Sequence, residues 1–143
     1  MSDANIQLIE NTYAAFQRGD IPALLDNLSP DVSWGIVGRE RDFPFAGIRE
    51  GKAGAEAFFR LLNETQDVTR FTPAKFVAAG DIVFVWGDCD WTMRGNNVAG
   101  GNDWLHVFTI RDGRIVSWRG HQDNALLAEA WRAAPVTKLA AAG

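Results

Sequence analysis

The spacing of apolar residues changes once along the chain, and this change constrains the fold more than any other feature. Over residues 3–18 and 52–65, apolar side chains recur three and four positions apart, which predicts two amphipathic helices. Asp20 can cap a short helix between them, with Pro22 tolerated in its first turn. From residue 68 onward the apolar period becomes two, which predicts strands. Helices followed by consecutive strands are typical of an α+β domain.

The predicted strands follow one another closely and are joined by turn signals. One strand is expected at 32–37, and the later ones at 68–79, 82–93, 102–110 and 114–123. Asp112-Gly113 favours a tight hairpin, because the turn needs positive φ angles. Strands joined in this way pair antiparallel, and long strands twist. We therefore expect a curved, mostly antiparallel sheet wrapped around three helices of the N-terminal half, with a last short helix at 124–134.

Length and composition limit the class of protein. The 143 residues fit a single domain, expected over 1–134, with a flexible tail at 135–143. The net charge is −4 and the basic residues are scattered, so no nucleic-acid partner is expected. No apolar run is long enough to cross a membrane, and the N-terminus lacks a signal-peptide pattern. Cys89 is the single cysteine, which fits a reducing compartment, and we expect a cytoplasmic protein.

Aromatic residues are frequent and indicate either a well-filled core or an apolar cavity. The chain has six Trp and nine Phe, and large aromatic side chains serve both purposes. The loop expected at 38–51 carries Phe43 and Phe45, which makes it too apolar to be freely solvated. We expect this loop to fold over the interior.

His106 is the most informative polar residue. Alternation along its strand places it on one face with Trp104 and Phe108. A polar side chain on such a face needs a hydrogen-bond partner, because an unpaired buried polar group is costly. His106 can therefore be a structural residue bonded to a neighbouring strand, or a functional residue that moves a proton near pH 7.

Four motifs follow one another at plausible spacing: "RGDIPALL" at 18–25, "PDVSW" at 30–34, "GIREGKAGAEAFF" at 47–59 and "DGRIVSWRGHQD" at 112–123. Together they resemble the nuclear-transport-factor-2-like superfamily, and within it the SnoaL-like, ketosteroid-isomerase-related branch. The resemblance implies a cone in which the sheet curves around the helices and leaves a deep pocket. It also implies an apolar small-molecule ligand, chemistry without a cofactor, and a homodimer formed through the outer face of the sheet. The fold alone does not name a reaction.

The same resemblance implies roles for particular residues. His106 falls where ketosteroid isomerases carry the protonated Asp of their oxyanion hole. Tyr13 lies on the helix that supplies their phenol donor, about half a turn or more from the matching position. Their general-base Asp has no counterpart near Ile36. SnoaL-type cyclases use an Asp and a His as acid–base groups, which makes Asp123 a candidate partner of His106, although Asp123 can equally cap the last helix.

Other residues complete the expected site or are set aside. The expected pocket walls are Trp34, Phe58, Trp104, Trp118 and Gln122. Asp88 and Asp90 share a strand face, which suits a solvated or interface position. Epoxide hydrolases of the superfamily place an Arg two residues from such an Asp, whereas the nearest Arg here is Arg94. The two His residues have no metal-ligand spacing, so no metal is expected.

We therefore predict that the chain binds an apolar small molecule and that His106, with Asp123 and Tyr13, transfers protons without a cofactor, as an isomerase, cyclase or dehydratase does. The alternative is a ligand-binding or dimerisation module of the same fold without catalysis. A third interpretation is a scaffold domain whose interior is filled by aromatic side chains. An open cavity of roughly several hundred cubic ångströms would count against this third interpretation.

Overall fold

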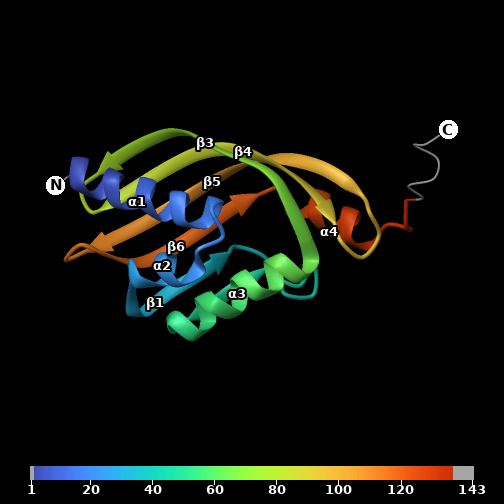
Figure 1. The fold of residues 1–143 in the computed structure, drawn as a ribbon, viewed down its shortest axis with the longest axis horizontal. Coiled ribbons are helices and arrows are strands. Elements are labelled where there is room, and N and C mark those ends of the chain that lie inside the picture. Colours follow the sequence, from blue (N-terminus) through green and yellow to red (C-terminus); the bar gives the residue numbers. More distant parts are fainter. Residues whose placement is uncertain (1, 137–143) are drawn as a thin grey trace.

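The computed structural model describes residues 2–136 and shows a single curved sheet with four helices in that part of the chain (Figure 1). In chain order the elements are α1 (Ser2–Gln17), α2 (Ile21–Asp26), β1 (Leu28–Ile36), β2 (Gly47–Glu50), α3 (Gly51–Thr65), β3 (Gln66–Ala79), β4 (Ile82–Met93), β5 (Ala99–Arg111), β6 (Arg114–Gln122) and α4 (Asn124–Arg132). The strand order in the sheet is β2-β1-β6-β5-β4-β3. Neighbouring strands are antiparallel except β1 and β6, which run parallel. The predicted fold class is confirmed.

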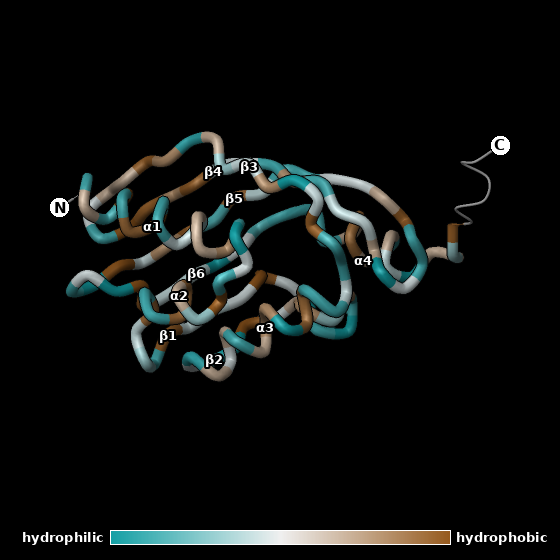
Figure 2. Tube along the Cα trace, in the orientation of Figure 1, coloured by the Kyte–Doolittle hydropathy of each residue, from teal (hydrophilic) through white to brown (hydrophobic). Residues whose placement is uncertain are grey.

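Helices α1, α2 and α3 cover one face of the sheet, as the sequence predicted (Figure 1). α1 packs against β3 and β4, and α3 packs against β1 and β2. Ile9 and Tyr13, on the predicted apolar face of α1, are buried. Figure 2 shows apolar and polar residues alternating along the long strands, which is typical of a sheet with one buried and one solvated face. The tail predicted at 135–143 lies outside the described residues from position 137 onward.

Local turn and cap signals were read correctly from the sequence. Asp112 and Gly113 have φ angles of 53° and 73°, and Arg111 pairs with Arg114 across the hairpin. The Asp20 side chain accepts a hydrogen bond from the Ala23 N–H and so caps α2. These residues are predictable because each satisfies a strictly local backbone requirement.

The segment between β1 and α3 closes one end of the cone. It contains the short strand β2, which pairs with β1 and which the sequence analysis treated as loop. Phe43 and Phe45 are fully buried, as expected for a segment that folds over the interior. Arg132 of α4 donates to the carbonyl oxygen of Arg41 at 2.8 Å, so α4 is tied to this segment from outside.

One register shift changes the face assignment in the last strand. Strict alternation along β6 would put Ile115 and Trp118 on opposite faces of the sheet. Both side chains are buried, because the pairing of β5 with β6 shifts between Thr109 and Ile110. A bulge of this kind has no clear signal in the sequence.

Candidate functional site

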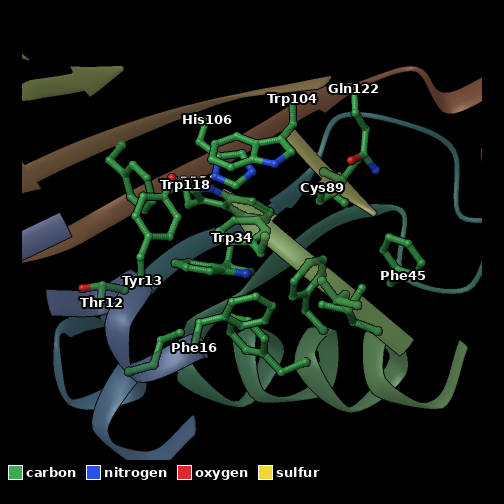
Figure 3. Close-up of a pocket in the computed structure, with 18 of the residues that line it drawn as sticks. Thr12, Tyr13, Phe16, Trp34, Phe45, Cys89, Trp104, His106, Trp118 and Gln122 are labelled. Atoms are coloured by element: carbon green, nitrogen blue, oxygen red, sulfur yellow. Dashed lines mark hydrogen bonds between the residues drawn. The ribbon is translucent and has the colours of Figure 1, made fainter. Parts of the chain in front are cut away.

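An apolar cavity lies between the concave face of the sheet and the helices (Figure 3). Its volume is about 80 Å³, whereas pockets for drug-sized ligands measure about 300–1,000 Å³. Aromatic side chains from α1, α3 and five strands or loops make most of the wall. The polar residues among those that line it are Thr12, Gln66, Cys89, His106 and Gln122, besides the Tyr13 hydroxyl. Side chains therefore fill most of the interior, and the volume does not count against a filled scaffold.

Seven of the eight residues predicted from the sequence meet at this cavity. They are Tyr13, Trp34, Phe58, Trp104, His106, Trp118 and Gln122. Asp123 is not among the residues that line it. Its Oδ1 accepts a hydrogen bond from the Leu126 N–H at 3.1 Å and caps α4. The structure thus favours the helix-cap interpretation of Asp123 over the acid–base one.

Tyr13 and His106 form a buried pair inside the cavity. Tyr13 lies on α1 and His106 on β5, and the Tyr13 hydroxyl is 2.7 Å from His106 Nδ1. The pKa of His106 is lowered to about 3, mainly by burial and to a lesser extent by His121. Burial also raises the pKa of Tyr13 well above its ordinary value. Both groups are therefore neutral near pH 7, and the contact between them is a hydrogen bond between uncharged groups, not an ion pair.

This arrangement pairs one imidazole nitrogen with the protein and leaves the other unpaired among the described residues. A neutral imidazole has one donor and one acceptor nitrogen, and the hydrogen bond at one of them sets the tautomer. Tyr13 occupies Nδ1, while Nε2 has no hydrogen-bond partner among residues 2–136. The sequence indicates both residues as site candidates. It does not predict their contact, because they are 93 positions apart.

Aromatic rings enclose the imidazole and explain why it stays neutral. Trp104 stacks on His106 with ring centroids 4.0 Å apart, and the ring of Trp118 lies nearly perpendicular to the imidazole with centroids 4.9 Å apart. Gly87, opposite Trp104 on β4, leaves room for the indole, since a Cβ there would lie 2.6 Å from Trp104 Cζ2. The ring environment removes water that would stabilise an imidazolium.

Cys89 also lines the cavity, and the sequence analysis did not assign it there. Burial raises the pKa of its thiol to about 11, with the flanking acids as lesser contributors. The thiol therefore stays protonated and is a weak nucleophile near neutral pH. Alternation along β4 was the available signal, because Asp88 and Asp90 on the solvated face leave Cys89 on the buried one.

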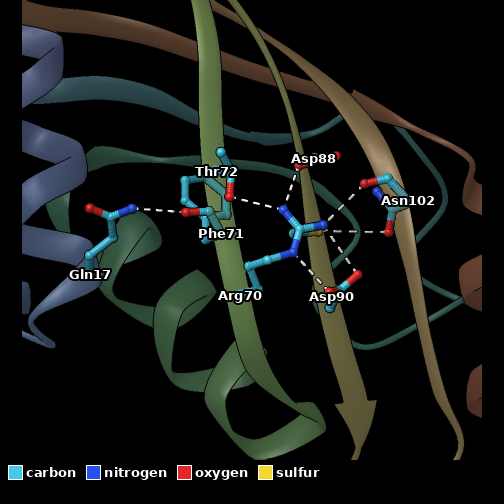
Figure 4. A network of polar contacts seen from close by, with 8 residues as sticks. Gln17, Arg70, Phe71, Thr72, Asp88, Asp90 and Asn102 are labelled. Carbon is cyan, nitrogen blue, oxygen red and sulfur yellow. Dashed lines mark hydrogen bonds and ion pairs between the residues drawn. The ribbon is translucent and has the colours of Figure 1, made fainter.

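Asp88 and Asp90 belong to a polar network on the outer face of the sheet (Figure 4). Arg70 of β3 lies between them, 2.7 Å from Asp88 Oδ1 and 2.8 Å from Asp90 Oδ2. Proximity in sequence indicated only Arg94, whereas the actual partner, Arg70, lies on the neighbouring strand. The network lies away from the cavity and is exposed, which fits the solvated position expected for the two acids.

The described part of the chain shows neither a metal-ligand cluster nor a helix suited to crossing a membrane. Within residues 2–136 no cluster of three or more His, Cys, Asp or Glu side chains is arranged to hold a metal ion. No helix in the same range is long and apolar enough to cross a membrane.

The chain resembles several solved structures over nearly its whole length. A nuclear-transport-factor-2-like protein from Burkholderia xenovorans is 30% identical, with 92% of this chain and 98% of that chain covered and a TM-score of 0.83. A second protein of this kind, of unknown function and from Burkholderia pseudomallei, is 28% identical. The match covers 93% of this chain and 100% of that chain, with a TM-score of 0.85. TerC, co-crystallised with polyporic acid, is 26% identical. The match covers 91% of this chain and 99% of that chain, with a TM-score of 0.81.

Comparison with curated proteins gave no significant match. The SnoaL-like domain matches residues 9–118, which contain β1 to β5 and both members of the Tyr13–His106 pair. The chain therefore belongs to the SnoaL-like family of the nuclear-transport-factor-2-like fold.

Proposed function

We propose that the chain binds a small, mostly apolar ring compound in the cavity and exchanges a proton with it at His106, without a cofactor. The observation that supports this proposal is the hydrogen bond between the Tyr13 hydroxyl and His106 Nδ1 inside an aromatic cavity. A buried polar pair in an apolar pocket is the usual constitution of a small-molecule site.

His106 carries the chemistry and Tyr13 positions it. The proposal requires the tautomer in which Nδ1–H donates to the Tyr13 oxygen, because Nε2 then presents a lone pair to the ligand. This nitrogen takes a proton from a carbon next to a carbonyl group and returns it to a neighbouring atom of the same ligand. The bond electrons stay in the ligand as an enolate between the two transfers, so no proton, electron or cofactor is consumed.

A ligand larger than about 80 Å³ requires the cavity wall to move, and one part of the wall is suited to this. A surface groove of about 790 Å³ shares six lining residues with the cavity: Phe16, Phe59, Leu62, Gln66, Val68 and Phe71. The rings of Phe16 and Phe71 are 5.1 Å apart in this shared wall. We propose that ligands enter from the groove by displacing these side chains. The relative co-crystallised with polyporic acid makes that compound a second ligand to test.

The proposal is tested with 2-indanone, a ring ketone whose α-hydrogens exchange with solvent deuterium. Ligand-observed NMR measures its binding to the purified protein, and proton NMR in D₂O follows the loss of the α-hydrogen signals. We expect binding and faster exchange than in buffer, and we expect polyporic acid to compete for the site. Absence of binding by both compounds would refute the ligand-binding proposal.

A ligand-binding module without catalysis is the second candidate. The observation that favours it is the low pKa of His106, about 3, because a group with so low a pKa is a weak general base in the empty cavity. Binding of 2-indanone with no acceleration of its exchange would select this second candidate.

We also propose that the chain forms a homodimer through the outer face of the sheet. Val77, Phe84, Trp86 and Leu105 lie on neighbouring strands of this face and are between 36% and 54% exposed. Val77 pairs with Phe84, and Trp86 with Leu105, so the four side chains form one apolar patch. A contiguous apolar patch on a soluble domain indicates an interaction surface, and a patch on an outward sheet face suits pairing with a second copy.

Replacing Trp86 by Glu is expected to convert the dimer to monomer, because a carboxylate at the centre of the patch would be buried without a partner. Native mass spectrometry and analytical ultracentrifugation at micromolar concentration measure the result. Trp131→Glu on α4 is the matched control, since Trp131 is similarly exposed but lies outside the patch. A monomeric wild-type protein, or a dimer that survives Trp86→Glu, would contradict the proposal.

A further inference from the structure

The indole N–H groups of Trp34 and Trp104 are buried donors without an acceptor. Both residues are 3% exposed, and neither Nε1 has a hydrogen-bond partner among residues 2–136. The core residue Trp91 shows the ordinary arrangement, because its Nε1 donates to Asn102 Oδ1 at 2.7 Å. Buried N–H groups are nearly always paired, so two exceptions in one cavity need an explanation.

Both residues line the cavity that contains Tyr13 and His106 (Figure 3). Trp104 stacks on His106, and Trp34 stacks on Trp118, whose ring in turn lies nearly perpendicular to that of His106. The indole ring of Trp104 therefore contacts the imidazole directly, and that of Trp34 contacts it through Trp118. Rotation to find a partner elsewhere is limited, since Trp34 also packs against Phe58 and Phe59, and Trp104 against Phe71.

We infer that Trp34 and Trp104 are specificity-determining residues whose indole N–H groups hydrogen-bond the carbonyl-type oxygens of the ligand. This inference rests on the proposed function and adds the chemical class that the site selects. An oxygen acceptor would satisfy donors that the protein leaves unpaired, whereas a hydrocarbon of the same shape would leave them buried and unpaired.

The charge of the wall restricts the class further. Among the described residues that line the cavity there is no Lys or Arg. Tyr13 and His106, which share a hydrogen bond, are both uncharged near pH 7. A carboxylate ligand would thus lose its hydration without gaining a cation. The preferred ligand is a neutral ketone, enone or quinone with a planar ring. In the proton transfer at His106, the same indole donors would stabilise the enolate oxygen as its charge develops.

The test compares 2-indanone with indane, which has the same ring system without the oxygen. Dissociation constants are measured by ligand-observed NMR for the wild-type protein and for Trp34→Phe and Trp104→Phe, which remove the N–H but keep an aromatic ring. Each substitution is expected to weaken 2-indanone binding by about 3- to 10-fold, the effect of one hydrogen bond, and to change indane binding by less than about 2-fold. Trp131→Phe, at an exposed position on α4, is the control and should change neither.

Indane binding also reports that each variant still folds around an intact cavity. If both compounds bind and the preference for 2-indanone is the same in the wild-type protein and both variants, the inference is wrong and the proposed function stands. If the wild-type protein binds neither compound, the proposed function fails and the inference fails with it.

Discussion

Replacing His106 by Gln is expected to slow the deuterium exchange of 2-indanone by about 100- to 10,000-fold, the range that a positioned acid–base side chain contributes. Gln keeps a polar group that can bond the Tyr13 hydroxyl, but it has no basic nitrogen. The cavity should therefore keep its shape and its affinity for the ketone. Exchange is measured by proton NMR at saturating ketone, so a change in binding does not enter the rate.

His121→Gln is the matched control for this substitution. His121 is the only other histidine, and it is exposed on β6 rather than facing the cavity. Its replacement should change the exchange rate far less than His106→Gln does, because His121 acts on the cavity only as the lesser cause of the lowered pKa of His106. Equal losses in both variants, or no loss in His106→Gln, would show that the acceleration does not come from the cavity imidazole.

Tyr13→Phe separates positioning from chemistry. Phe keeps the ring contacts with Phe71 and Phe108 but removes the hydroxyl that bonds Nδ1. We expect a smaller loss of rate than for His106→Gln, with ketone affinity nearly unchanged, because the base remains but its tautomer is no longer held. The double variant should be no slower than His106→Gln alone, since Tyr13 acts only through His106.

The sequence predicted correctly that His106 and Tyr13 face the interior. Alternation on β5 and helical spacing on α1 placed His106 and Tyr13 on the inward faces, because burial of apolar neighbours is what sets both periods. The contact between the two side chains depends on how α1 crosses the sheet, and no local pattern encodes that crossing. Asp123 was ambiguous for a physical reason, since a carboxylate before a helix suits a cap as well as a catalytic site.

What could not be read from the sequence depends on pairing between distant strands. Arg70 reaches Asp88 and Asp90 only because β3 lies beside β4 in a particular register. The unpaired indoles of Trp34 and Trp104 are likewise a property of the assembled cavity, since a Trp in a sequence gives no sign of whether its N–H will find an acceptor. The aromatic composition indicated a core or a cavity, and the structure shows an interior that is mostly core with a small space at the polar pair.

The stability of the protein is expected to fall in mild acid because of His106. The imidazole has a pKa of about 3 in the folded protein and about 6.5 in the unfolded chain. Between these values the unfolded chain binds a proton that the folded protein does not bind. The free energy of unfolding therefore rises with pH across this window, and its His106 contribution, complete above pH 6.5, is lost progressively as the pH falls toward 3.

Urea denaturation at pH 6.5, 5.5 and 4.5 measures this contribution when the wild-type protein is compared with His106→Gln at equal protein concentration. All other ionisable groups are common to the two proteins, so their effects largely cancel in the difference. Relative to the variant, the wild-type protein should lose on the order of 1 kcal/mol per pH unit below 6.5, or about 2–3 kcal/mol by pH 4.5. Parallel pH profiles would mean that the imidazole is hydrated and protonated in the folded state. They would also remove the physical basis for a neutral His106 in the cavity, because a neutral imidazole depends on the exclusion of water by Trp104 and Trp118.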